Sequence, residues 1–192
     1  WQEIAPFMVL LRQQASLAAR ALELTILTAA RSGEVLGATW SEFDLEAGLW
    51  TVPAERMKAD KEHRVTLSKE ALVILEEMEE AKHSKFIFPG HKANKPLSLT
   101  SLSKALRLAG GGKATVHGTA RSTFKDWASE RTAFPSEVSE MALAHSIGDK
   151  VEAAYRRGEL LEKRRALMQQ WATFLTTTAK GNVVPIGKRR VA

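Results

Sequence analysis

Four side chains that suit phosphate chemistry lie in the second half of the chain: His117, Arg121, His145 and Tyr155, the only tyrosine. Arginine is a planar cation that can donate two hydrogen bonds to one phosphate. An imidazole can donate or accept a proton, and a tyrosine hydroxyl can form a covalent ester. Together these groups could hold a phosphodiester, attack its phosphorus and move the proton that the attack releases.

Each of the four also has an ordinary structural explanation. A lone helical tyrosine usually belongs to the core or its rim, and a histidine at a helix end usually interacts with the helix dipole. An arginine on a helix face is usually solvated. The presence of all four within two or three predicted helices, rather than any one of them, indicates a site.

The first of these helices should carry both His117 and Arg121. They are four residues apart in a segment with helical periodicity, so one face would hold both, after a short extended entry over residues 115–117. The three glycines at 110–112 precede this entry. They lack the Lys-Ser/Thr that follows a phosphate-binding loop, and we interpret them as a flexible connector.

The next two helices should place His145 and Tyr155. Pro135 favours a helix start, and the pattern that follows ends near His145. Asp149 and Glu152 have the spacing of a capping box, which predicts a further helix with Tyr155 near its second turn. A histidine at a loop would thus precede a tyrosine on a short helix.

A second arginine interrupts an apolar helix near the N-terminus. Arg31 is followed by Ser32, Gly33 and Glu34, and apolar residues lie on both sides. An arginine in such surroundings needs an anion or a carboxylate, because an unpaired buried charge is costly. Two interpretations stay open: an Arg31–Glu34 pair on the surface, or an arginine that Glu34 holds toward an anionic ligand.

A small sheet should carry a lysine at its turn. Residues 50–53 and 63–67 are rich in β-branched residues and predict two antiparallel strands, and residues 86–88 predict a third. The charged segment 54–62 is then a hairpin turn that contains Lys58. A lysine on a turn is usually a solubilising residue, but a turn could also deliver it to a leaving oxygen.

Helical patterns account for most of the remaining sequence. Helices are predicted over the first 30 residues, after Ser68, after Ser98 or Thr100, and over about 159–177. We therefore expect an α+β fold that is mainly α-helical, with a small antiparallel sheet of about three strands.

The composition narrows the classes of molecule that the protein is expected to bind. The net charge is +6, with basic residues spread through the chain, which favours nucleic acid over the alternative of a merely basic protein. There is no cysteine, no metal-binding motif such as H-E-x-x-H, and no apolar run near the ~20 residues of a membrane span. We expect no metal, no cofactor and no membrane contact, and a cytoplasmic protein.

Five separated blocks give the chain a resemblance to a known family. They are Arg31 to Glu34, Lys58 with its neighbours, His117 to Arg121, residues 142–145 and residues 154–158. In order and rough spacing they resemble the blocks of tyrosine recombinases, and the chain is most similar to the phage-type integrases of prophages and genomic islands. One departure is that three residues, not the usual two, separate His117 from Arg121.

The resemblance implies a role for each residue. Arg31, Arg121 and His145 would hold the non-bridging oxygens of the scissile phosphate, and Glu34 would orient Arg31 and His117. Tyr155 would attack, which leaves a covalent 3′-phosphotyrosine and a free 5′-hydroxyl. The remaining two residues would move protons: Lys58 to the leaving oxygen, and His117 at the tyrosine or the phosphate.

The resemblance also implies a substrate and an assembly. The substrate would be double-stranded DNA at attachment sites, where a homotetramer on synapsed DNA integrates or excises a prophage or genomic island, with accessory DNA-bending or directionality factors. Residues 1–178 would form the catalytic domain and residues 179–192 a flexible basic tail, and N-terminal DNA-binding domains would precede this fragment. The amphipathic segment over 159–177 would dock on a neighbouring protomer.

Two other classes stay open from the sequence. A type IB topoisomerase uses similar chemistry but nicks and recloses one strand without paired core sites. A non-catalytic helical DNA-binding module would bind with a strong salt dependence and form no covalent adduct.

Overall fold

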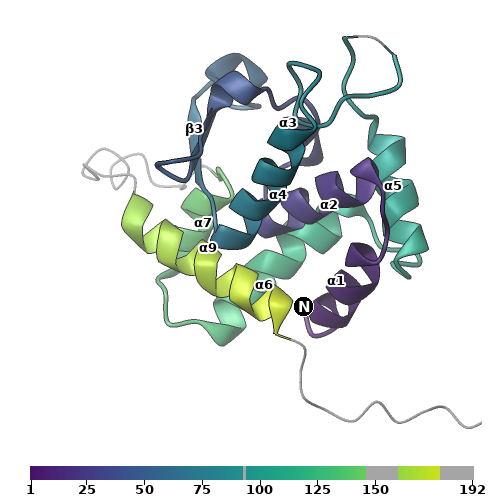
Figure 1. The fold of residues 1–192 in the computed structure, drawn as a ribbon. Coiled ribbons are helices and arrows are strands. Elements are labelled where there is room, and N and C mark those ends of the chain that lie inside the picture. Colours follow the sequence, from purple (N-terminus) through teal and green to yellow (C-terminus); the bar gives the residue numbers. More distant parts are fainter. Residues whose placement is uncertain (93, 146–159, 178–192) are drawn as a thin grey trace, which may run out of the picture.

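The computed structural model of the protein describes residues 1–92, 94–145 and 160–177. Helices dominate it, and a small sheet lies at one end, away from α1 and α5 (Figure 1). The elements in chain order are α1 (Ile4–Arg12), α2 (Leu17–Thr28), α3 (Ser32–Leu36), η1 (Trp40–Glu42), β1 (Phe43–Asp44), β2 (Leu49–Val52), η2 (Ala54–Arg56), β3 (His63–Thr66), α4 (Lys69–Glu80), α5 (Leu99–Leu108), η3 (Gly118–Ser122), α6 (Thr123–Arg131), α7 (Ser136–Ala142) and α9 (Leu161–Thr176). The expected mainly helical α+β fold is confirmed.

The sheet has three antiparallel strands in the order β1-β2-β3. The two strands predicted around the charged turn are present, and Val52 pairs with His63 at the end nearest that turn. The third strand is β1, so the prediction of a strand over residues 86–88 is wrong. In that segment Phe86 forms an isolated antiparallel bridge with Thr39, and residues 87 and 88 bend. The N–H of Ile87 donates to the carbonyl of Ala38 over 3.0 Å.

Helix α2 forms the centre of the core. Ser16 caps its first turn by accepting a hydrogen bond from the N–H of Ala19, and most of its residues are buried on every side. The helix ends at Ala29, whose left-handed conformation (φ 50°) turns the chain toward Arg31. The interruption that was visible in the sequence is therefore a real break between α2 and α3.

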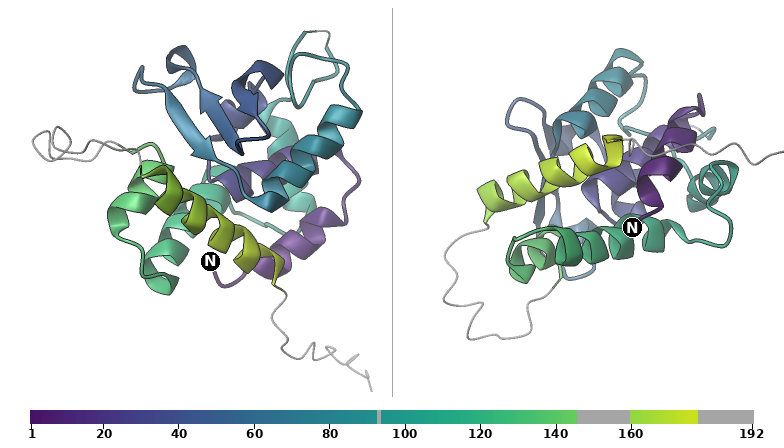
Figure 2. Two further views of the ribbon diagram at one scale, coloured as in Figure 1. Left: turned by 60° about the vertical axis from the view of Figure 1, so that its left-hand side comes forward. Right: turned by 90° about the horizontal axis from the view of Figure 1, so that it is seen from below.

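Helix α9 packs inside this chain. It contacts α1, α2, α4, α6, α7 and β3, and Figure 2 shows it lying across the other helices. Trp171 is fully buried, its ring packs against Phe124 and Trp127, and its indole N–H donates to the carbonyl of Ile26 over 2.8 Å. The expectation that this segment docks on a neighbouring protomer is wrong, because its apolar face is already covered.

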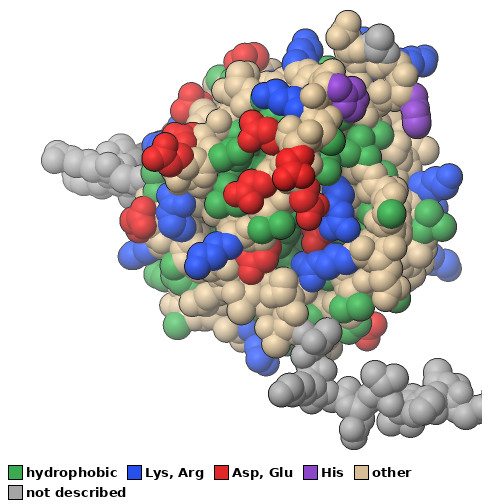
Figure 3. Space-filling view, in the orientation of Figure 1, with side chains coloured by type: hydrophobic (Ala, Val, Ile, Leu, Met, Phe, Trp, Pro, Cys, Tyr) green, Lys and Arg blue, Asp and Glu red, His purple; other side chains and the backbone are tan. Residues whose placement is uncertain are grey.

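The surface that α4 and α9 present is acidic at its centre. Asp and Glu side chains gather there, with Lys and Arg toward the margins (Figure 3). Exposed acidic residues of α4 contribute to it: Glu76, Glu77, Glu79 and Glu80. This face repels a polyanion such as DNA.

In the part of the chain that the structure describes, no helix is long and apolar enough to cross a membrane.

Candidate active site

Among the predicted site residues that the structure describes, Arg121 is the most deeply buried, with 4% of its surface exposed. Its Nη1 donates to the carbonyl of Ala29 over 2.9 Å, and its Nη2 donates to the carbonyl of Leu143 over 2.6 Å. The Nε atom is buried and has no hydrogen-bond partner within the described residues. The guanidinium therefore lies between the end of α2 and the end of α7, held in place before any ligand arrives.

The electrostatic surroundings of Arg121 are unfavourable for a cation. Burial, and after it the charge of Arg31, lowers the pKa of Arg121 to about 10, although Glu34 and Glu140 act in the opposite direction. Two guanidinium groups thus repel each other across a poorly solvated space. An anion bound between them would relieve that repulsion.

Arg31 and Glu34 form the ion pair that the sequence suggested. The backbone N–H of Arg31 donates to Glu34 Oε2 over 2.9 Å, and Arg31 Nη1 donates to Glu34 Oε1 over 2.7 Å. The carboxylate of Glu34 is buried, whereas 31% of the Arg31 side chain is exposed. Glu34 thus holds one side of the guanidinium, and part of the Arg31 side chain stays exposed. The predicted pair is present, with its carboxylate buried rather than on the surface.

His145 follows the end of α7, as predicted. Ala144 adopts a left-handed conformation (φ 50°), and the N–H of His145 reaches back to the carbonyl of Glu140 over 3.0 Å, as in a Schellman motif. The side chain is exposed, and its Nε2 lies 3.0 Å from Nη2 of Arg121. The turn therefore brings an accessible imidazole against the buried arginine.

Glu140, which the sequence analysis did not single out, bonds to the imidazole of His145. Oε2 of Glu140 lies 2.5 Å from Nδ1 of His145, and Oε1 lies 2.7 Å from Nζ of Lys125. Burial alone would raise the pKa of Glu140, but the hydrogen bonds from Lys125 and His145 outweigh it and lower that pKa. An ionised Glu140 can only accept, so Nδ1 carries a proton and Nε2 accepts from Arg121.

His63 is a second residue that the sequence did not reveal. It lies at the start of β3, and its imidazole bonds to the backbone of Ala142 at the end of α7. Burial, followed by the charge of Arg164, lowers its pKa to about 4, with smaller effects from Arg31 and Arg121. His63 is therefore neutral at pH 7 and joins the sheet to the elements around the arginines.

The extra residue between His117 and Arg121 is accommodated by a π-helical turn. The segment η3 is π-helical, and both the N–H and the hydroxyl of Thr123 donate to the carbonyl of Gly118, the latter over 3.0 Å. Such single wide turns occur inside α-helices, often at functional sites. The predicted extended entry over 115–117 is wrong, because the helix already includes residue 116.

His117 and Lys58 are both exposed. The side chain of His117 makes no hydrogen bond within the described residues, and the carboxylate of Glu34 bonds to Arg31. Lys58 lies on the predicted β2–β3 turn, whose base at His63 adjoins the end of α7, so the turn emerges beside the arginines. Tyr155 and the helix predicted around it lie outside the described residues.

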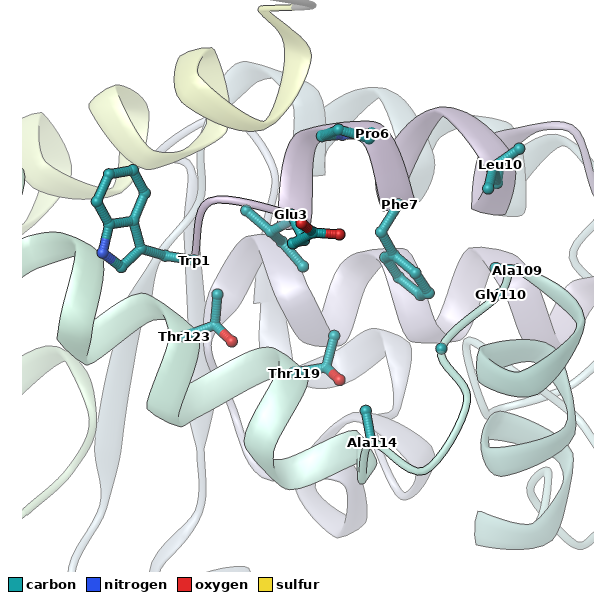
Figure 4. A pocket seen from close by; sticks show the side chains of 12 residues that line it. Trp1, Glu3, Pro6, Phe7, Leu10, Ala109, Gly110, Ala114, Thr119 and Thr123 are labelled. Carbon is teal, nitrogen blue, oxygen red and sulfur yellow. The ribbon is translucent and has the colours of Figure 1, made fainter. Parts of the chain in front are cut away.

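A nearby cavity does not coincide with this cluster. About 370 Å³ in volume, it lies between α1, the 109–114 loop and the helix of η3 and α6. Figure 4 shows Thr119 and Thr123 on its wall opposite Phe7, and Arg31 and Arg121 do not line it. No group of three or more His, Cys, Asp or Glu within residues 1–92, 94–145 and 160–177 could hold a metal ion.

The sequence matches the model of one family and is similar to several integrases of Escherichia coli and of phages. The model of the phage integrase family matches residues 3–159. Prophage integrase IntA of Escherichia coli (strain K12) is 39% identical over 162 residues, which cover 83% of this chain and 39% of that protein. The integrase of Enterobacteria phage P4 is 35% identical over 173 residues, covering 81% and 39%. The chain thus spans about two fifths of the length of these relatives.

Solved structures share the fold at low sequence identity. A lambda integrase tetramer bound to a Holliday junction gives a TM-score of 0.56 with 17% identity, over 82% of this chain and 47% of that one. The XerA recombinase gives a TM-score of 0.52 with 14% identity, over 86% and 65%. At these identities the likeness concerns the fold alone.

Proposed function

This chain belongs to the phage integrase family, and on that premise we propose that it is the catalytic part of a site-specific DNA recombinase. The enzyme would cleave and rejoin DNA through a covalent 3′-phosphotyrosine. The observation that carries the proposal is the cluster at the ends of α2 and α7, where the buried Arg121 lies beside Arg31 and His145.

The cluster is suited to hold the scissile phosphate. Arg31 and Arg121 can donate to its non-bridging oxygens, and their mutual repulsion falls when the anion lies between them. His145 adds a third donor once a proton reaches Nε2, and Glu140 stabilises the resulting imidazolium. Because carbonyls and a carboxylate fix the guanidinium groups of Arg31 and Arg121 beforehand, little reorganisation of these two donors is needed when charge develops in the transition state.

The covalent step needs a nucleophile and a route for two protons. The hydroxyl oxygen of Tyr155 would attack phosphorus as the bond to the 5′-oxygen breaks, with His117 assisting removal of the tyrosine proton. Lys58 would give a proton to the departing 5′-oxygen. The phosphotyrosine keeps the energy of the phosphodiester, so a 5′-hydroxyl from another strand can reverse the step and rejoin DNA.

The full-length protein would act on double-stranded attachment sites as a homotetramer, in order to exchange strands between two duplexes and to integrate or excise a prophage or genomic island. The lambda structure in the comparison is itself a tetramer on a Holliday junction. In this chain the acidic face over α4 disfavours DNA. We propose that the DNA lies against the surface where Arg31 and His145 are exposed. Domains outside this chain and accessory factors would supply further DNA contacts.

A nicked suicide duplex tests the proposal. The full-length protein is incubated with such a duplex bearing the attachment site of its own element, and denaturing electrophoresis detects the covalent complex. We expect an adduct with the wild type and none with Tyr155→Phe, which should still bind the duplex. A missing wild-type adduct with salt-dependent binding would indicate a DNA-binding module, and relaxation of supercoiled DNA without core sites would indicate a topoisomerase.

A further inference from the structure

Arg56 connects the turn that carries Lys58 to the arginine cluster. It is the last residue of η2, two positions before Lys58. Its Nη1 donates to both carboxylate oxygens of Glu42, and its Nη2 donates to the backbone carbonyl of Glu34. One planar side chain thus bonds simultaneously to the segment after α3 and to α3 itself.

The Glu42 end of this connection is firmly anchored. The carboxylate also accepts from the N–H and the hydroxyl of Thr39, over 3.3 and 3.0 Å, and from the indole N–H of the fully buried Trp50 over 2.9 Å. The Glu42 side chain is 8% exposed and is held by Thr39 and Trp50, so Arg56 cannot shift without breaking its hydrogen bonds to a fixed carboxylate.

The Glu34 end leads directly to the predicted phosphate clamp. While the carbonyl of Glu34 accepts from Arg56, its carboxylate accepts from the backbone and side chain of Arg31. The packing is close here, since a Cβ at Gly37 would lie 2.9 Å from Nη2 of Arg56. A glycine at this position therefore leaves the room that the guanidinium requires.

We propose that Arg56 is a positioning residue for the leaving-group step: it fixes the base of the turn so that Lys58 reaches the 5′-oxygen of a phosphate held by Arg31. The inference rests on the proposed function. The side chain of Lys58 makes no hydrogen bond among the described residues, so its position depends on the backbone of the turn, which η2 and β3 hold at its two ends. Arg56 is the residue that ties this backbone to α3.

The alternative is that Arg56 only stabilises the fold, and the chain contains a matched control for that role. Arg20 pairs with the buried Glu23 within α2, and its Nη2 also donates to the carbonyl of Arg12 at the end of α1. The Arg20 side chain is 24% exposed, compared with 22% for Arg56. Glu23 also accepts a hydrogen bond from Arg12. Arg20 and Arg56 therefore each belong to a hydrogen-bond network around one carboxylate. Only the Arg56 network touches the predicted site.

The test compares two suicide duplexes in the full-length protein, one with the ordinary 5′-oxygen and one with a 5′-bridging sulfur, which leaves without needing a proton. For Arg56→Gln we expect cleavage of the oxygen substrate to slow at least about tenfold and that of the sulfur substrate by no more than about twofold, as for Lys58→Ala. The double variant should be no slower than Lys58→Ala alone. Arg20→Gln should affect both substrates equally or not at all.

A variant that keeps the positive charge controls for the possibility that Arg56→Gln does not fold. Arg56→Lys can still pair with Glu42 but cannot bond Glu34 in the same plane, so we expect a smaller defect with the same substrate dependence. Equal slowing on both substrates by folded Arg56 variants, or no slowing at all, would overturn the inference. If the wild type formed no adduct with either duplex, the proposed recombinase function itself would fail, and the role of Arg56 with it.

Discussion

The buried cluster around Arg121 and the exposed turn around Lys58 are built in opposite ways. Arg121 bonds to two backbone carbonyls from distant parts of the chain and to His145. Lys58 is exposed and forms no hydrogen bond among the described residues. Yet the two regions are neighbours, since the base of the turn meets the end of α7 through His63.

The difference matches two chemical tasks. Donors that hold a phosphate work best when they are fixed in advance, because no free energy is then lost in aligning them. An amine that protonates a leaving oxygen needs to reach a ligand that arrives from solution, so it has to be exposed. Burial serves the first task and would defeat the second, which predicts different mutational signatures in the two regions.

The largest effect should come from Arg121→Lys. Lysine cannot replace the planar set of donors, so the carbonyls of Ala29 and Leu143 compete for one ammonium group. We expect cleavage of the suicide duplex to fall by roughly 10²–10³ and the free energy of unfolding to fall by about 1–3 kcal/mol. Urea unfolding of the isolated chain measures the second effect, and an unchanged midpoint would show that the cluster is not preorganised by these bonds.

Arg31→Lys should separate activity from stability. The bidentate contact to the phosphate that we propose for Arg31 would be lost, so we expect cleavage to fall by roughly 10². The side chain is about one third exposed, and a backbone N–H still binds Glu34, so the free energy of unfolding should change by less than about 1 kcal/mol. A loss of stability as large as that of Arg121→Lys would place Arg31 in the buried region instead.

His63 should make stability depend on pH between 4 and 6.5. Its pKa in the folded protein is about 4, below the ordinary 6.5, so in this range the unfolded chain binds a proton that the folded chain does not. Stability is therefore complete above pH 6.5 and should fall by roughly 1–3 kcal/mol as the pH drops to 4.

Unfolding in urea at several pH values tests this dependence. His63→Gln cannot titrate and should give a flatter curve, whereas the exposed His83→Gln should follow the wild type. The depressed pKa of Glu140 contributes only at the acid end, where its carboxylate becomes protonated, and all three proteins share it. Parallel curves for wild type and His63→Gln would contradict the assignment.

The smallest effect should follow deletion of Thr119, which converts the π-helical turn into an ordinary one. The residues from Ala120 onward can keep their packing, and the glycine connector before the helix can absorb the shift of His117. We expect cleavage to stay within about threefold and the free energy of unfolding within about 1 kcal/mol of wild type.

Deletion of the exposed Asp126 in α6 is the matched control for this experiment. It would rotate the preceding residues by about 100° relative to Trp127, and so remove one side of the helix from the core. We expect that variant to unfold. A Thr119 deletion that proved equally disruptive would show that the wide turn is required for folding rather than merely tolerated.

Local sequence was sufficient for features that depend on neighbours along the chain. Ser68 caps its helix as predicted, and of the two candidates for the next cap, Ser98 and Thr100, Ser98 fills the position. An N-cap needs only the N–H groups of the next turn. The Arg31–Glu34 pair and the turn at Lys58 were predicted for the same reason. Where a choice depended on a distant partner, prediction failed, as with the strand expected over 86–88 and the apolar face of α9.

The sequence by itself therefore determined the residue types of the site, their order and the helices and turn that carry them. Only the tertiary structure decided which of them meet. Arg121 bonds to Ala29 and Leu143, and His63 to Ala142, and no spacing rule links positions so far apart. The physical reason is that helical and strand periodicities describe a residue's own element, whereas burial and charge pairing arise where separate elements end against one another.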